Sequence, residues 1–530
     1  MSKPAIAKFA DLAGRMWALA IALVLYSCGY AWMSMSSSLG TLLCGVVIQA
    51  LGYTGAQVLQ SVIIADTTAA KWRGLVIGLN MLPFMINFTI AGPLANVALR
   101  YYDWRTGYRL WVVLGPIAAL PLLTLLVMGH RRARRAAARA AAANPAAGPP
   151  APEPAGDRAR KLVREMDLVG MSLFSSGLLL ILLPFSMNGF STHSSVFLLS
   201  NAGLLAGVLL LALFGLWETR VEHPFLPYQL LFNGTVMGLC VIGLLDFAGF
   251  FLSWTYLSAF IQVIENWDQT RTAYLVSTQT VVSTIASILI GSLLVCLGRY
   301  KACLVSGLVV RLVGVALMVH YRSVEHTPAM LVICQVLQGF GGGMIAVTMQ
   351  VPAQHAVSRS KVALVTALEL FAVEVGAAMG TSLASAIFTT VMPGLMRRHL
   401  SWMDPEELAR ILGSLRAMLT YPLESPVRIG ASLAWSETMQ LLCLVAFLVQ
   451  VPALFVALVL PDANLNERST PSAPAHRYSD PPSTPARGHQ GPVRRATFSA
   501  HEAIRYQSPP WRATPPRPRP SGEGTPRPQA

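Results

Sequence analysis

The chain has 530 residues, of which 54% are hydrophobic and only 12% are charged, and its formal net charge is +15. Soluble domains carry roughly 25% charged residues, so this composition excludes an ordinary soluble domain and indicates burial in lipid. The basic residues gather in loops and tails, so they argue for membrane topology and against a nucleic-acid partner. All seven cysteines fall inside apolar segments, which argues against an extracellular disulfide framework.

Long apolar segments recur along the whole chain. A helix needs about 20 residues to cross about 30 Å of hydrocarbon at about 1.5 Å per residue. Twelve segments approach or exceed that length: 16–36, 41–65, 74–98, 109–129, 167–187, 196–217, 235–260, 273–297, 302–320, 328–350, 362–390 and 434–460. The sequence therefore predicts an all-α polytopic membrane protein with about twelve transmembrane helices, embedded in a lipid bilayer.

The distribution of Lys and Arg predicts the orientation of these spans. If the amino terminus is inside, the inside segments hold 29 of the 40 basic residues and the outside loops hold 10. Positive charge is retained on the cytoplasmic side. We therefore expect both termini in the cytoplasm, in the plasma membrane or in endosomal vesicles.

Composition divides the chain into five parts. We expect a partial N-terminal bundle of four spans, a basic Ala/Pro-rich cytoplasmic linker, two connecting spans, a six-helix C-terminal bundle and a disordered cytoplasmic tail. Their ranges are 1–129, 130–166, 167–217, 218–460 and 461–530. The tail holds fifteen prolines and ten arginines and too few aliphatic residues to fold. Within it, Thr497 follows two arginines at a spacing that some kinases favour. The alternative is a disordered tail without a regulatory role.

Two short basic segments carry an acid near an arginine. Asp11 lies four residues before Arg15, and Asp66 lies close to Arg73. Such residues can cap a helix and pair across helix ends, forming an ionic latch that breaks when two bundles rock. An ordinary basic membrane anchor is the alternative.

A polar stripe follows the span at 41–65. Its members recur at offsets of four, four and three, which places them on one helical face: Gln49, Tyr53, Gln57 and Gln60. Amides and a phenol can bind an oxygen-rich ligand, so the stripe predicts a substrate path. Hydrogen bonding between helices explains it equally well.

The later spans carry further polar candidates for the substrate path. These are Ser253, Tyr256, Tyr274, Gln279, Gln335 and Gln338. Four glycines follow the last of them, at 339, 341, 342 and 343. Close approach of helices explains these glycines better than flexing does.

Ionisable residues inside spans require a reason, because each costs roughly 2.5–3.5 kcal/mol at a helix centre. The deepest are Asp246, Arg311, Glu369 and Glu374. An acid in a low-dielectric path can exchange a proton near neutrality, so Asp246 and Glu374 are candidates for proton coupling. Alternatively, Arg311 holds one of them in a static ion pair.

One long outside loop is expected at 391–433. It carries Tyr421 and Arg428 among several charged residues. Its length predicts a role in recognition or gating, and a solvated Ω-like excursion is the alternative.

Several of these motifs resemble the fungal siderophore-iron transporter family of the major facilitator superfamily. The resemblance is carried, in collinear order, by Lys3 to Arg15, Gly52 to Gln60, Ile64 to Thr68, Trp72 to Gly74, Phe251 to Val263, Gln335 to Gly343, Val365 to Leu368, Glu374 to Gly376, and Tyr421 to Arg428. It implies the superfamily fold with fourteen helices, of which the first two are expected to be lacking here. It also implies proton-coupled import of iron-siderophore chelates by alternating access, and a recognition loop at 391–433.

Other functions remain open at this stage. A drug-proton antiporter shares the fold but has an extended glycine-rich motif, of which only Gly92 and Pro93 stand here. A glutathione-proton antiporter and a transport-dead sensor or fragment are further alternatives. No nucleophile elbow, phosphate loop or metal-protease helix is present in the sequence. We therefore expect no enzyme, no cofactor and no protein-bound metal.

Overall fold

The computed structural model describes residues 2–143, 167–187, 194–221, 224, 230, 232–324, 327–358, 361–462 and 464. The chain divides into two compact units. One comprises Met1–Val127 with Ala155–Ser472, and the other comprises Met128–Pro154 with Ala473–Ala530. The site residues discussed below all lie in the first unit. Thr497 and nearly all of the predicted tail lie outside the described residues.

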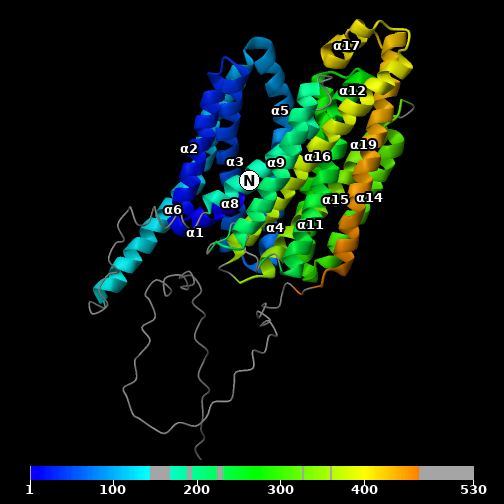
Figure 1. The fold of residues 1–530 in the computed structure, drawn as a ribbon. Coiled ribbons are helices and arrows are strands. Elements are labelled where there is room, and N and C mark those ends of the chain that lie inside the picture. The colour runs from blue at the N-terminus through cyan, green and yellow to red at the C-terminus, as the bar shows by residue number, and fades with distance from the viewer. Residues whose placement is uncertain are drawn as a thin grey trace, which may run out of the picture. The chain divides into compact units, whose positions relative to one another are not determined.

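The described residues are almost entirely helical (Figure 1). The helices of the first half are α1 Lys3–Ala13, α2 Arg15–Ser34, α3 Leu39–Thr67, α4 Ala70–Asn80, α5 Leu82–Tyr101 and α6 Trp104–Ala143. The connecting helices are α8 Leu168–Met187 and α9 Ser194–Glu218. The second half comprises α11 Gly234–Trp254, α12 Leu257–Glu265, α13 Gln269–Leu297, α14 Lys301–Tyr321, α15 Pro328–His355, α16 Val362–His399, α17 Pro405–Gly413, α18 Leu415–Leu419 and α19 Pro426–Val459.

The prediction of an all-α membrane protein is confirmed. Within the described residues, eleven helices are long and apolar enough to cross a membrane, and each overlaps a predicted span. The twelfth predicted span, 167–187, is the helix α8, whose apolar part Leu168–Pro184 is shorter. Large apolar side chains on α9 are exposed, for example Leu205 at 72% and Leu209 at 61%, as expected of a face that meets lipid.

Several helix boundaries differ from the sequence prediction. The span at 74–98 is divided into α4 and α5, because Pro83 has no N–H to continue the helical hydrogen bonds. Helix α6 runs on through the first part of the predicted linker, where alanine and arginine favour a helix. At the predicted outside loop, α16 extends to His399 and α19 begins at Pro426, so only residues 400–425 connect them.

The core of the second half lies where α11, α16 and α19 pack side by side (Figure 1). Glycines allow α11 and α16 to approach closely. A Cβ atom at Gly376 would collide with the carbonyl group of Leu244, and one at Gly380 would collide with the carbonyl group of Ala248. Since both glycines lie four residues apart on α16, they present one smooth strip to α11.

We expect Gly376→Ala to destabilise the protein although alanine favours helices. The gain in helix propensity is about 1 kcal/mol, whereas overpacking against a backbone carbonyl costs about 1–3 kcal/mol. The matched control is Gly394→Ala on the same helix, where a Cβ atom has no neighbour within 4 Å. Unfolding in mixed detergent micelles measures both. Equal stability of the two variants would contradict the close approach.

Candidate functional site

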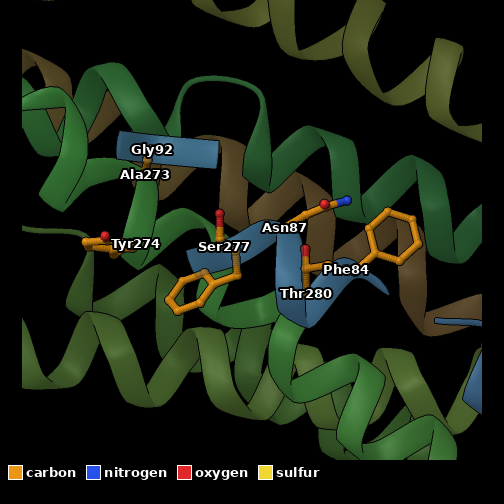
Figure 2. Close-up of a pocket in the computed structure, with 8 residues that line it drawn as sticks. Phe84, Asn87, Gly92, Ala273, Tyr274, Ser277 and Thr280 are labelled. Atoms are coloured by element: carbon orange, nitrogen blue, oxygen red, sulfur yellow. The ribbon is translucent and has the colours of Figure 1, made fainter. Parts of the chain in front are cut away.

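A pocket opens between α5 of the first half and α13 of the second half (Figure 2). Its cavity volume is about 220 Å³. It is lined by Phe84, Asn87, Phe88, Gly92, Ala273, Tyr274, Ser277 and Thr280. Because the two walls come from different halves of the chain, any movement of one half against the other changes the shape of this pocket.

Helical spacing explains why the polar groups of the pocket lie together. On α13, Tyr274, Ser277 and Thr280 recur every three residues, so their side chains share one face. On α5, Asn87 lies beside Phe88, whose ring centroid is 5.2 Å from that of Tyr274. Hydroxyl and amide groups next to aromatic rings suit a ligand that has both oxygen atoms and apolar surface.

Of the lining residues, the sequence analysis singled out only Tyr274 as a candidate for the substrate path. The others are ordinary residues of an apolar span when they are considered singly. A usable signal was the repeat of hydroxyl groups every three residues along α13, from Tyr274 to Thr280.

The predicted polar stripe on α3 does not line this pocket. Gln49 and Gln57 are half-buried, whereas Tyr53 and Gln60 are exposed. The side-chain amide of Gln60 donates a hydrogen bond to Asn80 Oδ1 of α4. That contact favours the helix-to-helix explanation for one member of the stripe.

The polar candidates of the second half are distributed among several helix contacts. Gln338 Nε2 donates to Ser253 Oγ at 3.1 Å, which joins α15 to α11. The ring of Tyr256 stacks on Phe388 with centroids 4.1 Å apart. Gln279 and Gln335 are both buried, at 8% and 2% exposure.

The glycine run on α15 serves close packing, as expected from the sequence. A Cβ atom at Gly339 would collide with the Gln279 carbonyl group, and one at Gly343 would collide with the Ser283 carbonyl group. On the other side of the run, a Cβ atom at Gly341 would meet the backbone of Arg311. The run therefore brings α13 and α14 against α15.

Asp246 and Arg311 form a buried ion pair inside the second half. Arg311 Nε lies 3.0 Å from Asp246 Oδ1, and the side chains are 5% and 1% exposed, in that order. The guanidinium carbon of Arg311 also lies 5.3 Å from the ring centroid of Phe250. Of the two partners that the sequence left open for Arg311, the structure brings Asp246 to it.

Glu374 has a different partner, which the sequence analysis did not identify. Lys3 Nζ lies 3.1 Å from Glu374 Oε1, and the Lys3 side chain is 1% exposed whereas that of Glu374 is 49% exposed. Glu369, five residues earlier on α16, is buried at 3% exposure. The two candidates for proton coupling, Asp246 and Glu374, thus belong to separate ion pairs.

Comparison with known proteins identifies the family. The model of the Major Facilitator Superfamily matches residues 1–221 and 239–396. The chain is 30% identical to MFS siderochrome iron transporter C of Aspergillus fumigatus, over 88% of this chain and 76% of that protein. It is also 30% identical to siderophore iron transporter mirC of Emericella nidulans, over 89% and 77%. A third relative is siderophore iron transporter 1 of Schizosaccharomyces pombe, 29% identical over 84% and 71%.

The chain belongs to the fungal siderophore-iron transporter family of the major facilitator superfamily. It is an integral membrane protein with the helical fold of that superfamily. The resemblance drawn from its motifs is therefore confirmed.

In this transporter, Arg15 joins two acids at the start of α2. Its Nη1 lies 2.8 Å from Asp11 Oδ1, and its Nε lies 3.1 Å from Asp66 Oδ2 of α3. Arg73 instead donates to the Ala65 carbonyl group at 2.9 Å and to Gln354 Oε1 at 3.4 Å. Arg15 and Arg73 thus both make contacts near the end of α3.

The two candidates that the sequence placed in an outside loop hold residues 400–425 to the helices. Arg428 is 1% exposed, and its guanidinium donates to the carbonyl groups of Val263, Met418 and Gln262 at 2.7–3.0 Å. The Tyr421 hydroxyl donates to Glu407 Oε1 of α17. Neither side chain lies at the pocket in Figure 2.

Acid is expected to loosen the segment that contains α17. The hydrogen bond from Tyr421, helped by Arg410, lowers the pKa of the Glu407 carboxyl. A depressed pKa in the folded state stabilises the fold above the unfolded value, about 4.3 for Glu, and that stabilisation is lost as pH falls through the folded value. Pepsin cleavage within residues 400–425 should therefore increase only below about pH 4.

The control for this pH effect is Tyr421→Phe, which removes the donated hydrogen bond and keeps the ring. The variant should become sensitive to pepsin at a higher pH than the parent protein. Identical pH profiles would show that the Tyr421 hydroxyl does not hold the Glu407 carboxylate.

Proposed function

We propose that this chain is a secondary active transporter that imports iron-siderophore chelates together with protons, by alternating access. The observation that carries the proposal is the polar and aromatic pocket between α5 and α13, in a chain whose relatives are named as siderophore iron transporters. A pocket with one wall from each half is the geometry that alternating access requires. We therefore propose a role in transport.

The chemistry of the pocket suits part of an iron chelate. Siderophore chelates are large and rich in oxygen, so they need hydrogen-bond donors and flat apolar surface. Asn87, Ser277 and Thr280 supply donors, and Phe88 and Tyr274 supply rings. The cavity of about 220 Å³ accommodates a portion of such a ligand in this conformation. Iron enters as cargo inside the chelate.

Two acids are proposed for proton coupling. Asp246 is almost fully buried beside Arg311, whereas Glu374 is half-exposed beside Lys3. A half-exposed acid can take a proton from a water-filled path without unfolding of the surrounding helices. We therefore assign the entering proton to Glu374 and a structural or relay role to Asp246.

The remaining parts of the proposal concern placement in the membrane. Both termini are assigned to the cytoplasm, in the plasma membrane or endosomal vesicles, and residues 400–425 to the outside. We also propose the five-part organisation of the chain that the sequence predicts, with its boundaries adjusted to the ends of the helices. A kinase acting on Thr497 also stays a proposal.

Uptake of radio-iron tests the pocket. In cells that lack other siderophore carriers, we expect Asn87→Ala and Ser277→Ala each to raise the KM for the chelate by about tenfold, because each removes a buried hydrogen bond of about 1.5 kcal/mol. Thr278→Ala is the matched control, since the Thr278 hydroxyl bonds the Tyr274 carbonyl group within its own helix and does not line the pocket. An unchanged KM in both pocket variants would move the substrate path elsewhere.

The same assay separates import from export. A drug-proton or glutathione-proton antiporter would leave chelate uptake at the background of empty cells. It would instead lower the accumulation of its own substrate when the chain is expressed. That pattern would replace the importer with an antiporter of the same fold.

A further inference from the structure

Helix α1 touches both halves of the transporter. It packs against α2 and α3 of the first half and against α16 of the second half. Two neighbouring positions on its buried face have different neighbours. Ala7, fully buried, packs with Ala363 and Ala367 of α16 and with Val58 and Val62 of α3, whereas Ala10, 2% exposed, packs with Leu19 and Ala22 of α2 and with Leu59 of α3. Helix α1 therefore bridges the halves, and it meets α16 at Ala7 and α2 at Ala10.

The bridge ends in a buried cation. Lys3 is 1% exposed, and its ammonium donates to the Leu370 carbonyl group at 3.0 Å and to Glu374 Oε1 at 3.1 Å. Burial lowers the pKa of this ammonium, against the opposing attraction of Glu374 and Glu369. A buried cation that loses its counter-charge is strongly destabilising. The position of α1 against α16 thus depends on the charge of Glu374.

We propose that Lys3 and Glu374 form a latch between the two halves, closed while Glu374 is ionised and released when Glu374 takes up a proton. The proton adds to the exposed carboxylate, which becomes neutral and no longer pairs with the ammonium. Lys3 is then a positioning residue, since it acts through Glu374 and touches no substrate. The latch deepens the proposed function, because it links the entering proton to the separation of the halves.

The surroundings of Glu374 contain few other charges that could substitute for Lys3. Glu369 lies on the same helix and also attracts Lys3, and the Tyr53 hydroxyl of α3 lies within electrostatic range of Glu374. Helix α8 carries no ionisable residue in its described range. Several ionisable side chains on the other helices that contact α16 have partners or neighbours away from Glu374: Asp246 with Arg311, Asp66 with Arg15, His355 near Arg73, Glu437 with His399, Glu407 with Arg410, and Arg428 with backbone carbonyl groups.

Cysteine labelling in the full chain tests the latch without any transport. Ala7→Cys reports on the position where α1 meets α16, and Ala10→Cys reports on the position where α1 meets α2. Each is labelled with a maleimide, and labelling of the parent chain with its seven native cysteines is subtracted. Lys3→Gln and Glu374→Gln are then introduced separately and together into both reporters.

We expect each neutral variant to raise the labelling rate of Ala7→Cys by about tenfold and to leave Ala10→Cys unchanged. The labelling rate of Ala7→Cys in the double variant should not exceed the rate in either single variant. The charge exchange of Lys3→Glu with Glu374→Lys should restore protection of Ala7→Cys from labelling. In the parent chain, acidification should raise the ratio of Ala7→Cys to Ala10→Cys labelling, and Lys3→Gln should abolish that dependence.

Two results would overturn the latch. Equal labelling of Ala7→Cys with and without Lys3 would show that the ion pair does not hold α1 against α16. An equal rise at both reporters would show that α1 comes away as a whole, so that Lys3 serves only the folding of this helix. Because labelling needs no substrate, the labelling result can be interpreted even if the chain does not import chelates. Conversely, a failure of the latch would not affect the test of chelate import.

Discussion

Replacing Arg311 with methionine should lower the free energy of unfolding by about 3–5 kcal/mol, because Asp246 would remain buried without its counter-charge. Both side chains of the pair are at most 5% exposed, and they join α14 to α11 inside the second half. Methionine keeps much of the volume of the arginine stem, so the loss reports the charge and not a cavity. Unfolding in mixed detergent micelles measures the effect.

A double-mutant cycle separates the pair from other effects of the substitution. Asp246→Asn combined with Arg311→Met should recover at least about 1 kcal/mol relative to the sum of the single changes. Arg271→Met is the matched control, since Arg271 is 75% exposed and its pair with Asp268 lies at the surface. Additive losses in the cycle would mean that Asp246 and Arg311 do not depend on each other.

Replacing Arg428 with methionine should cost about 2–4 kcal/mol, because hydrogen bonds from a charged donor each contribute about 1.5–3 kcal/mol and do not add fully. The guanidinium joins the first turn of α19 to the carbonyl groups of Gln262 and Val263 at the end of α12. It also binds the carbonyl group of Met418 in α18. We expect faster protease cleavage at residues 400–425 along with the lower stability.

Two further substitutions check this account of Arg428. Lysine cannot present donors in the same fork, so Arg428→Lys should recover less than half of the loss. Arg416→Ala, at an exposed arginine in the same segment, should change stability by about 0.5 kcal/mol or less. A loss of equal size at Arg416 would show that the segment responds to any change in charge and not to the bonds of Arg428.

The helical fold followed from sequence, because length and hydropathy alone decide whether a segment can span a bilayer. Every predicted span has a helix at its place. The breaks within the spans at 74–98 and 235–260 were missed. In the first, Pro83 is a visible signal. In the second, α11 ends at Trp254 and α12 begins at Leu257, and no proline or glycine marks the break.

The candidate site was less predictable, since periodicity places a residue on a helix face but does not say which helix that face meets. The stripe around Tyr53 could be defined on α3, yet the pocket lies between α5 and α13. Arg311 had two possible acids within spans, and only packing brings Asp246 to it. Lys3 resembles any basic residue beside a membrane until α16 is seen to bury it.

The most direct test of the account is the dependence of chelate uptake on a proton gradient. Vesicles that contain the purified full chain would receive radio-iron as several purified siderophores, with an imposed inward proton gradient, no gradient, or a gradient collapsed by a protonophore. The account predicts accumulation of at least one chelate only under the inward gradient, and loss of that dependence in Glu374→Gln. Accumulation of radio-iron that is independent of the gradient, or no accumulation with any chelate, would contradict proton-coupled siderophore import.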